Sequence, residues 1–433
     1  MPQARLIRPT YSQRFRCIGS ACEDTCCQGW TVPIDREACE KYRGLPDSPL
    51  RTLIDVSLTV SPQCAERPKP AGFAAIRMDA SNRCPLLTED RLCRIQADLG
   101  EEFLSRACAT YPRIAHSTGG IEETALTLSC PEAARLVLLS SDLLEAASPH
   151  EESFGGGDPS LPPHFWPIRA AVLALVRNRL YPLWQRLFLL GLFCRRLDSI
   201  AKGELTGPVP AFVEGFESAV ATGSLRQAME TLPIDRAAQL DAVLRLAGTM
   251  LHRSNLHPRF VACVQAFTVG IGNGPGATLE SLADRYASAH DRYYAPFFER
   301  HPQVAENYLV NTILRCRFPY GREGMLPGAR AEMAREFAKL TAQFALMKGL
   351  LIGVAGFHRE RFSGEHVVHT VQSASKHFDH HPEFLDMAHK LLVESQLDGA
   401  RGTAILLRDA GPSAPMPTAP AVHAPEPRAG KRV

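Results

Sequence analysis

The sequence predicts a mainly α-helical protein in two parts: a cysteine-rich N-terminal metal-binding domain of short helices and loops, followed by an all-α helical domain. Ten of the 13 cysteines lie before residue 131, within the first third of the chain. Beyond residue 163, apolar residues recur at the spacing of helix faces, and the alternation typical of half-buried strands is missing. With 433 residues, 45% of them hydrophobic, the chain is long enough for two or three domains with real cores.

Two changes of composition set the expected boundaries. Residues 147–163 contain a run of three glycines and several prolines, which predicts a linker. Residues 409–433 are rich in proline and alanine and cannot bury enough apolar surface to fold, so we expect a disordered tail. This division gives a cysteine-cluster metal-binding domain at 1–146 and an all-helical domain at 164–408.

The cysteine-rich part shows little sign of regular sheet, and three elements can be placed in it. Ser48 before Pro49 predicts a helix start, because serine caps a helix and proline fits its first turn. Residues 124–129 alternate between apolar and polar and predict a short strand. Pro131 begins a helix expected over 132–146, which places Cys130 at its N-cap. The amides and dipole at a helix start favour the thiolate form that a metal ligand needs.

The second part is expected to be helical almost throughout, as a bundle or an irregular helical array. Helix-period apolar faces occur at 165–177, 182–200, 234–251, 258–269 and 279–290. The clearest pattern is a stripe of seven apolar residues spaced alternately by four and three. It predicts one continuous buried helix face, made of Met333, Phe337, Leu340, Phe344, Met347, Leu351 and Val354.

The N-terminus has no apolar segment of the length that a secretory signal needs, because arginines and polar residues precede the first cysteine. The most apolar stretch, 337–356, contains Lys339 and Lys348, whereas a transmembrane helix needs about 20 mostly uncharged residues. We therefore expect a cytoplasmic protein with no membrane partner. Thiols stay reduced in the cytoplasm, so clustered cysteines there favour metal or redox chemistry over disulfides, and an odd cysteine count fits full pairing poorly.

The formal net charge of +2 gives no general attraction to nucleic acid. The sequence also lacks a stripe of Arg and Lys interleaved with aromatic residues, which is typical of nucleic-acid grooves. Nucleic acid is therefore excluded as an expected partner.

The cysteine spacing predicts a bound metal without deciding which one. Cys22 and Cys26 are four residues apart and can face one side of a turn, whereas Cys27 must point elsewhere. Zinc favours a closed tetrahedral set with two to four residues between paired ligands, which only Cys22 and Cys26 meet. An iron–sulfur cluster tolerates more scattered ligands, often followed by proline. Prolines occur after or near Cys84, Cys108 and Cys130, and the spacing leaves iron–sulfur and zinc equally supported.

Two other patterns resemble sites but have simpler interpretations. The glycines at 272, 274 and 276 imitate a nucleotide or S-adenosylmethionine loop, yet they follow a helix pattern rather than a strand, so we expect a helix–helix loop. A histidine group near 358–381 has no matching carboxylate, so we expect exposed or helix-capping histidines: His358, His366, His369, His377, His380 and His381. The remaining cysteines are expected to be structural: Cys39, Cys64, Cys194, Cys263 and Cys316.

With these patterns in place, the chain resembles the flagellin lysine N-methylases, which carry a cysteine-cluster domain of a zinc- or iron-chelating class. The resemblance begins with residues 17–30, which read Cys-Ile-Gly-Ser-Ala-Cys-Glu-Asp-Thr-Cys-Cys-Gln-Gly-Trp, together with Asp35 and Tyr42. It continues through 84–96, 104–113 and 126–132. Residues 306–309, 345–348 and 373–377 fit the helical part more loosely. The match extends to about residue 400 and is most specific at its N-terminal end.

The resemblance implies methyl transfer from S-adenosylmethionine to lysine ε-amines of flagellin, by an enzyme holding a 4Fe–4S cluster, with zinc as the alternative. The matched cysteines are candidate metal ligands, and they exceed the four that one cluster needs: Cys17, Cys22, Cys26, Cys27, Cys84, Cys93, Cys108 and Cys130. Either two metals bind or some of these cysteines are structural. Trp30 is a candidate for cation–π contact with the sulfonium or the lysine, or for packing.

Two further interpretations stay open from the sequence. One is a metal-binding or metal-delivery protein without catalysis. The other is a scaffold with structural zinc, which explains the cysteines but not their family pattern. The long helical second part favours the enzyme, because a simple chelator does not need it.

Overall fold

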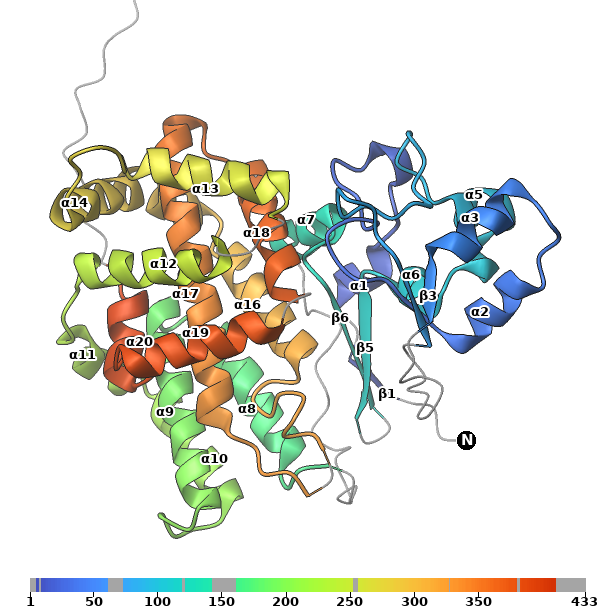
Figure 1. Cartoon of the computed structure of the whole chain (residues 1–433). Coiled ribbons are helices and arrows are strands. Elements are labelled where there is room, and N and C mark those ends of the chain that lie inside the picture. The colour runs from blue at the N-terminus through green and yellow to red at the C-terminus, as the bar shows by residue number, and fades with distance from the viewer. Residues whose placement is uncertain are drawn as a thin grey trace, which may run out of the picture.

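The computed structural model describes residues 5–7, 9–60, 73–118, 121–141, 161–251, 256–326, 328–379 and 382–409. Figure 1 shows a large helical domain beside a small cysteine-rich lobe, with a narrow sheet between them. The mainly α-helical fold class is confirmed. The predicted tail from 410 onward, most of the predicted linker, and Cys64, His380 and His381 lie outside the described residues.

The cysteine-rich lobe is built from short elements. Its helices are η1 (Gly19–Ala21), α2 (Arg36–Arg43), α3 (Pro49–Ser57), α5 (Arg94–Leu99), η2 (Glu101–Phe103) and α6 (Arg106–Thr110). The predicted helix start at Ser48 is confirmed, since its hydroxyl accepts a hydrogen bond from the Arg51 amide. A small antiparallel sheet, missed in the sequence, has the order β2 (Pro33–Ile34), β4 (Ala74–Ile76) and β3 (Leu58–Val60). Strands this short contain too few residues for a period-2 pattern to register.

A second sheet joins the lobe to the helical domain, with the order β1 (Arg5–Ile7), β6 (Ile121–Leu126) and β5 (Arg113–Thr118). β5 and β6 form an antiparallel hairpin, and β1 runs parallel to β6. The predicted strand at 124–129 exists, but it starts at Ile121 and ends at Leu126. The chain then turns into α7 (Pro131–Leu139).

Helix α7 starts as predicted, with Cys130 as its N-cap, but the predicted end at 146 is wrong. The helix stops at Leu139 because the Asn307 side-chain amide donates to the carbonyl oxygens of Val137 and Ser140, at 3.0 and 2.7 Å. These bonds satisfy carbonyls that a continuing helix would use. Residues from 142 to 160 lie outside the description.

The buried face of this second sheet belongs to the helical core. Arg169 forms a buried two-point ion pair with Glu123, both at 3.0 Å, and Asn311 exchanges hydrogen bonds with the Leu126 backbone. The apolar cluster of the helical domain also includes Tyr11 and Phe15, on and just after α1 (Thr10–Arg14), whereas the cysteine lobe has a separate core running from Val32 to Ile95. The domain boundary drawn from composition stays a prediction. The two cores group the residues differently, because the start of the chain and the second sheet pack into the core of the helical domain.

The helical domain contains all five helices predicted from apolar periodicity, each within two residues of its expected bounds. They are α8 (Phe165–Arg177), α9 (Leu183–Ala201), α12 (Arg236–Leu251), α13 (Pro258–Gly270) and α14 (Leu279–Ala289). A π-helical turn, η4 (His290–Tyr294), continues α14 into α15 (Ala295–Arg300). The other helices are α10 (Val209–Ala221), α11 (Leu225–Glu230), α16 (Gln303–Cys316), α17 (Met333–His358), η5 (Arg359–Arg361), α18 (Gly364–Asp379), α19 (Pro382–Glu394) and α20 (Ala400–Leu407).

Helix α17 is the centre of the domain and contains the predicted seven-residue stripe, all of it buried. By length and composition, Met333–Arg361 could span a membrane, but 89% of its most apolar window is buried among other helices. It packs against α9, α12, α13 and α19 (Figure 1). The expectation of a buried helix rather than a membrane span is therefore confirmed.

The contact between α13 and α17 depends on glycines. A Cβ atom added at Gly270 would lie 1.8 Å from the Gly353 carbonyl oxygen, and one at Gly353 would lie 2.3 Å from the Phe267 ring. We expect Gly270→Ala to lower the free energy of unfolding by about 1–3 kcal/mol, because the helices must separate. Gly215→Ala on exposed α10, where a Cβ meets nothing within 4 Å, is the matched control and should be neutral or stabilising. Urea denaturation of both variants measures the difference, and equal stabilities would contradict the prediction.

Candidate metal centre and the adjoining groove

Five of the eight predicted ligands line one small cavity in the cysteine-rich lobe, although they come from distant positions in the chain. They are Cys26, Cys27, Cys84, Cys93 and Cys108. The cavity has a volume of about 70 Å³, and its other walls are mostly apolar side chains of the lobe core. One water needs roughly 10–15 Å³ on this measure, so the space holds several atoms. No three His, Cys, Asp or Glu side chains among the described residues already stand close enough together to hold a single metal ion.

Local backbone contacts bring these thiols together. The Cys84 amide donates to the Cys27 carbonyl oxygen at 2.8 Å, which joins two loops far apart in sequence. Cys93 is the N-cap residue of α5, and Cys108 lies in α6. Asp35 fixes α6, because its carboxylate caps α2 and also accepts a hydrogen bond from the Arg106 amide at 2.7 Å. Asp35 thus connects the start of α2 to the helix that holds a thiol.

The thiols differ in acidity. The Cys27 thiol donates to the Cys26 sulfur, which lowers the pKa of Cys26 to about 7, and the nearby Lys376 ammonium acts in the same direction. Burial raises the pKa of Cys84 to about 11 and that of Cys108 to about 12. Cys26 is therefore the thiol that ionises most readily, and the others hold their protons until a cation replaces them.

The lining of the cavity also includes a buried hydroxyl without a partner. Tyr42 is 1% exposed, and its hydroxyl has no hydrogen-bond partner among the described residues. Trp30 and Tyr111 stack on each other at the cavity wall, and the Trp30 indole donates to the Cys26 carbonyl oxygen at 2.7 Å. Trp30 thus packs and positions a thiol-bearing loop. The convergent thiols could ligate a metal group, and the unpartnered Tyr42 hydroxyl could donate a hydrogen bond to one of its sulfurs. The lining of the cavity therefore fits a thiolate-bound metal group.

The other three predicted ligands do not line this cavity. Cys22 and Cys26 both raise the pKa of Cys130, so Cys130 lies near these two thiols although neither it nor Cys22 lines the cavity. Backbone amides of α7 lower the pKa of Cys130 as expected, but burial outweighs them and raises it to about 12. The helix start thus favours the thiolate as predicted, but its effect is too weak to offset the burial of this thiol. Cys17 is exposed and does not line the cavity.

A buried charged network ties the cysteine loop to the helical domain. The Asp24 carboxylate contacts the Lys376 ammonium of α18 at 2.7 Å and the His257 ring at 3.3 Å. Lys376 also donates to the Thr25 carbonyl oxygen at 2.9 Å, next to Cys26. Burial alone would raise the pKa of Asp24, but the His257 and Lys376 contacts hold it well below its usual range. The loop that holds Cys26 and Cys27 is thus fixed by side chains from the second half of the chain.

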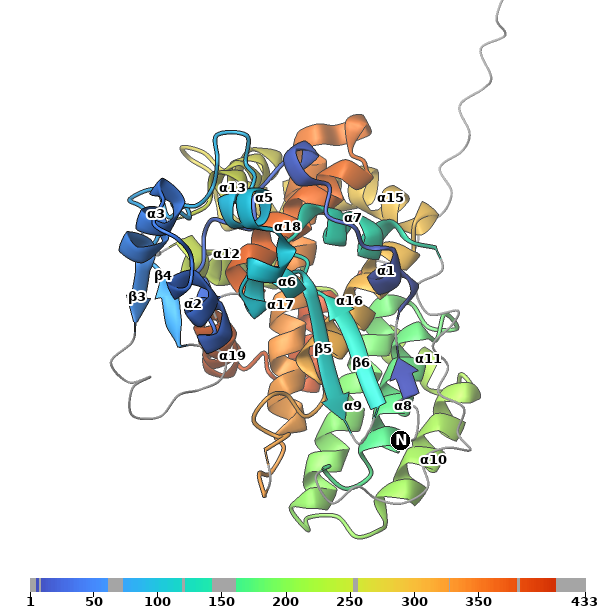
Figure 2. The same cartoon turned by 90° about the vertical axis from the view of Figure 1, so that its right-hand side faces the viewer.

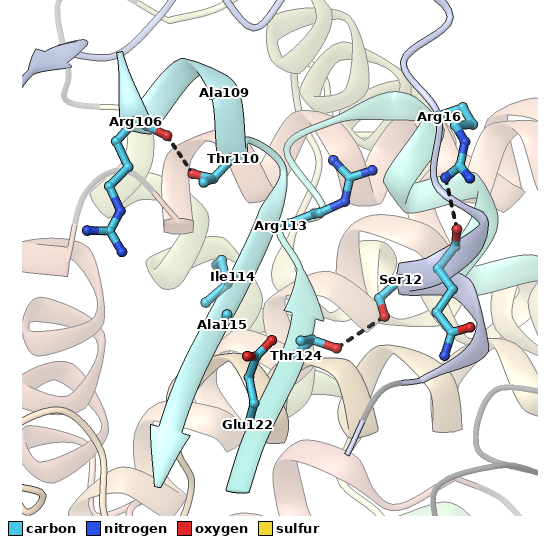
Figure 3. A pocket seen from close by; sticks show the side chains of 11 residues that line it. Ser12, Arg16, Arg106, Ala109, Thr110, Arg113, Ile114, Ala115, Glu122 and Thr124 are labelled. Atoms are coloured by element: carbon cyan, nitrogen blue, oxygen red, sulfur yellow. Dashed lines mark hydrogen bonds between the residues drawn. The ribbon is translucent and has the colours of Figure 1, made fainter. Parts of the chain in front are cut away.

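Helix α6 is a wall shared between the thiol cavity and a large open groove. Cys108 faces the cavity, whereas Arg106, Ala109 and Thr110 line the groove. The groove has a volume of about 890 Å³ and lies over the open face of the β5–β6 hairpin (Figure 3). Figure 2 shows α1 beside this hairpin. Three arginines line it against a single carboxylate, that of Glu122: Arg16, Arg106 and Arg113.

A further cavity of about 470 Å³ opens in the helical domain between α9, α11 and α15. Trp184, Tyr294 and Phe298 line it together with charged residues. Much of this charge serves the fold: Asp409 pairs with Lys348 and His290. The buried Gln185 carbonyl oxygen has no hydrogen-bond partner among the described residues.

Several sequence candidates have structural roles. The glycine-rich segment at 272–276 is the loop between α13 and α14, as predicted. His377 is buried against Phe260 rather than exposed, so that expectation is wrong for it. Cys39, Cys194 and Cys263 are buried, as expected of structural cysteines, and Cys316 is half-buried.

Sequence reasoning did not assign roles to Lys376, Arg106 or the Tyr42 hydroxyl. The one local signal for Lys376 is that it lies on a helix face made otherwise of apolar or small residues, where a lysine is expected to be buried with a partner. Tyr42 and Lys376 both lie within the stretches that carry the family resemblance, but nothing in the sequence relates them to the thiols. Their proximity arises only from tertiary packing.

Comparisons with known proteins identify relatives of the chain. Residues 169–406 match the family described as the FliB lysine N-methylase C-terminal domain. A lysine-N-methylase of Salmonella typhimurium is 24% identical over 405 residues, which cover 90% of this chain and 96% of that protein. A flagellar biosynthetic protein FliU of Salmonella muenchen is 32% identical over 145 residues, which cover 33% of this chain and 83% of that protein. No solved structure matches the chain.

Proposed function

Because the chain belongs to the FliB lysine N-methylase family and is a protein-lysine N-methyltransferase, we propose that it methylates lysine ε-amines of flagellin in the bacterial cytoplasm. The proposed methyl donor is S-adenosylmethionine, and the proposed metal group is a cysteine-bound 4Fe–4S cluster. The observation that supports the cluster most is the gathering of five thiols around one cavity with a free tyrosine hydroxyl.

The cluster ligands would come from these five thiols, of which a single cluster uses four. Zinc remains the alternative for such a site, since it also takes four thiolates. If three of the five thiols rather than four held a 4Fe–4S cluster, its fourth iron would be available to bind the amino and carboxylate groups of the methyl donor. The chain itself supplies the apolar walls that exclude water and the Tyr42 hydroxyl that can donate to a sulfur.

The thiol cavity cannot enclose S-adenosylmethionine by itself. Pockets for ligands of that size have volumes of about 300–1,000 Å³, whereas this cavity has about 70 Å³. The adjoining groove and the cavity in the helical domain are both within the range. The groove shares α6 with the thiols, so a donor bound along its α6 edge would lie near the metal and leave the hairpin face to the protein substrate.

The target lysine must lose a proton before it attacks a methyl group, since an ammonium has no lone pair. Its pKa in solution is about 10.4. Desolvation and nearby positive charges both lower that pKa and so favour the neutral amine. The apolar walls of the thiol cavity would provide such desolvation.

The test is anaerobic purification followed by a methylation assay. We expect brown protein with iron and acid-labile sulfide in equal amounts, and transfer of label from S-adenosylmethionine to lysines of flagellin. Colourless protein that contains zinc and is active would overturn the iron–sulfur part alone. Protein with an intact cluster that leaves flagellin unlabelled would overturn flagellin as the substrate.

A further inference from the structure

We propose that the groove over the β5–β6 hairpin receives an acidic segment of the protein substrate and presents its lysine to the thiol cavity behind α6. This inference rests on the proposed function and adds the place and the charge of the substrate-binding surface. A methylase that acts on a protein needs an open surface beside its reaction centre, because a folded or partly folded chain cannot enter a closed cavity. The groove is open and adjoins the thiols through one short helix.

The charges in the groove are unbalanced. Arg16 and Arg113 each donate to the Phe15 carbonyl oxygen, at 2.8 and 3.0 Å, so two guanidinium groups share one neutral acceptor. Among the described residues, no ion pair to a carboxylate involves Arg16, Arg113 or Arg106. Like charges held this close repel each other, and an anion placed between them relieves the repulsion. Carboxylates on the bound chain are the matching chemistry, since guanidinium binds them at two points.

The floor of the groove suits a polypeptide. Ala115 and Thr124 face each other across the hairpin, and both line the groove. The Thr124 hydroxyl hydrogen-bonds with that of Ser12 on α1. These small side chains do not protrude far from the sheet, so they leave space for a bound chain. In Figure 3, Arg106 lies on one side of the hairpin, whereas Arg113 reaches toward Arg16 on the other. A chain lying across the hairpin would therefore meet positive charge on both sides.

This arrangement also explains how a lysine is brought to a positive surface. A lysine alone would be repelled, but flanking acidic residues bind the arginines and hold it there. The proposed substrate segment is thus a lysine next to acidic residues.

Charge reversal tests the proposal. Arg106→Glu is the first variant, because its guanidinium has no partner among the described residues, and the Arg16→Glu/Arg106→Glu double variant is the second. We expect the KM for flagellin to rise about tenfold or more for the double variant, with weaker salt dependence and little change in kcat. Arg106→Lys should restore most of the affinity. Arg196→Glu, an exposed arginine on α9, is the matched control.

Flagellin binding is also measured without S-adenosylmethionine, together with the iron content and absorption spectrum of each variant. Loss of binding with an unchanged spectrum supports the groove. Flagellin in which acidic residues beside a methylated lysine are changed to arginine should bind the double variant better than the wild type. Unchanged binding and KM in the double variant would overturn the groove while leaving the methylase function intact. Normal binding by wild-type protein with no methylation would overturn the proposed function while leaving the groove.

Discussion

Cys84→Ser is expected to lose most of the bound iron and to lower flagellin methylation by more than about 100-fold. Cys84 is buried, lines the cavity, and is joined through its amide to the Cys27 carbonyl oxygen. Serine keeps the size of the side chain but offers a hydroxyl, which does not ionise to replace a thiolate ligand. Even groups behind metal ligands change affinity or activity by about 10–100-fold, so the loss of a ligand should exceed that range.

A matched control separates loss of metal from loss of folding. Cys39 is 2% exposed and belongs to the same small core, but it does not line the cavity. Cys39→Ala should therefore keep iron and activity while paying a modest cost in stability for a smaller side chain. Iron and sulfide analysis, visible absorption and the methylation assay are compared for both variants. Full iron content in Cys84→Ser would contradict the assignment of this cavity to the cluster.

The Cys17→Ser variant tests whether the cavity geometry or the family resemblance identifies the metal ligands correctly. Cys17 matches the sequence pattern of the family, yet it is exposed and is not one of the five cavity thiols. We expect this variant to retain its iron. Iron loss from Cys17→Ser and not from Cys108→Ser would mean that the resemblance, rather than the cavity, identifies the ligands.

The sequence predicted the helical domain well because its helices are long and amphipathic. The stripe from Met333 to Val354 marks a helix that is buried against several neighbours, and such a period stands out in any window. The bounds of α8 agree with the prediction at both ends. The small strands and the end of α7 depend instead on tertiary contacts, such as the Asn307 amide, which no local pattern records.

The site was predicted in part for a related reason. The cysteines are recognisable by their type and number, so eight candidates could be named from the sequence. Which of them share a cavity depends on loops joined across large sequence distances, as in the contact between Cys27 and Cys84. The groove was invisible in the sequence, since Arg16, Arg106 and Arg113 come together only when α1, α6 and β5 pack.

Lys376→Met is expected to destabilise the protein by about 3–5 kcal/mol and to accelerate loss of the metal. The Lys376 and Asp24 side chains are only 7% and 4% exposed, so removing the lysine leaves a buried carboxylate without its ammonium partner. The Thr25 carbonyl oxygen also loses its donor, which frees the loop that holds Cys26 and Cys27. Urea denaturation measures the stability. The rate of iron transfer to an external chelator measures how firmly the loop with Cys26 and Cys27 retains the metal.

The double variant Asp24→Asn/Lys376→Met shows whether the ion pair or only the packing of the lysine matters. Removing both charges leaves no uncompensated buried carboxylate, and the asparagine keeps the acceptor for the Gln372 amide, which lies 2.7 Å from Asp24. We therefore expect the double variant to be more stable than Lys376→Met alone. Iron should still leave it faster than it leaves the wild type, because the donor to Thr25 is missing in both variants. A double variant as unstable as the single one would show that the lysine acts by packing, and that the helical domain does not hold the cysteine loop through this charge pair.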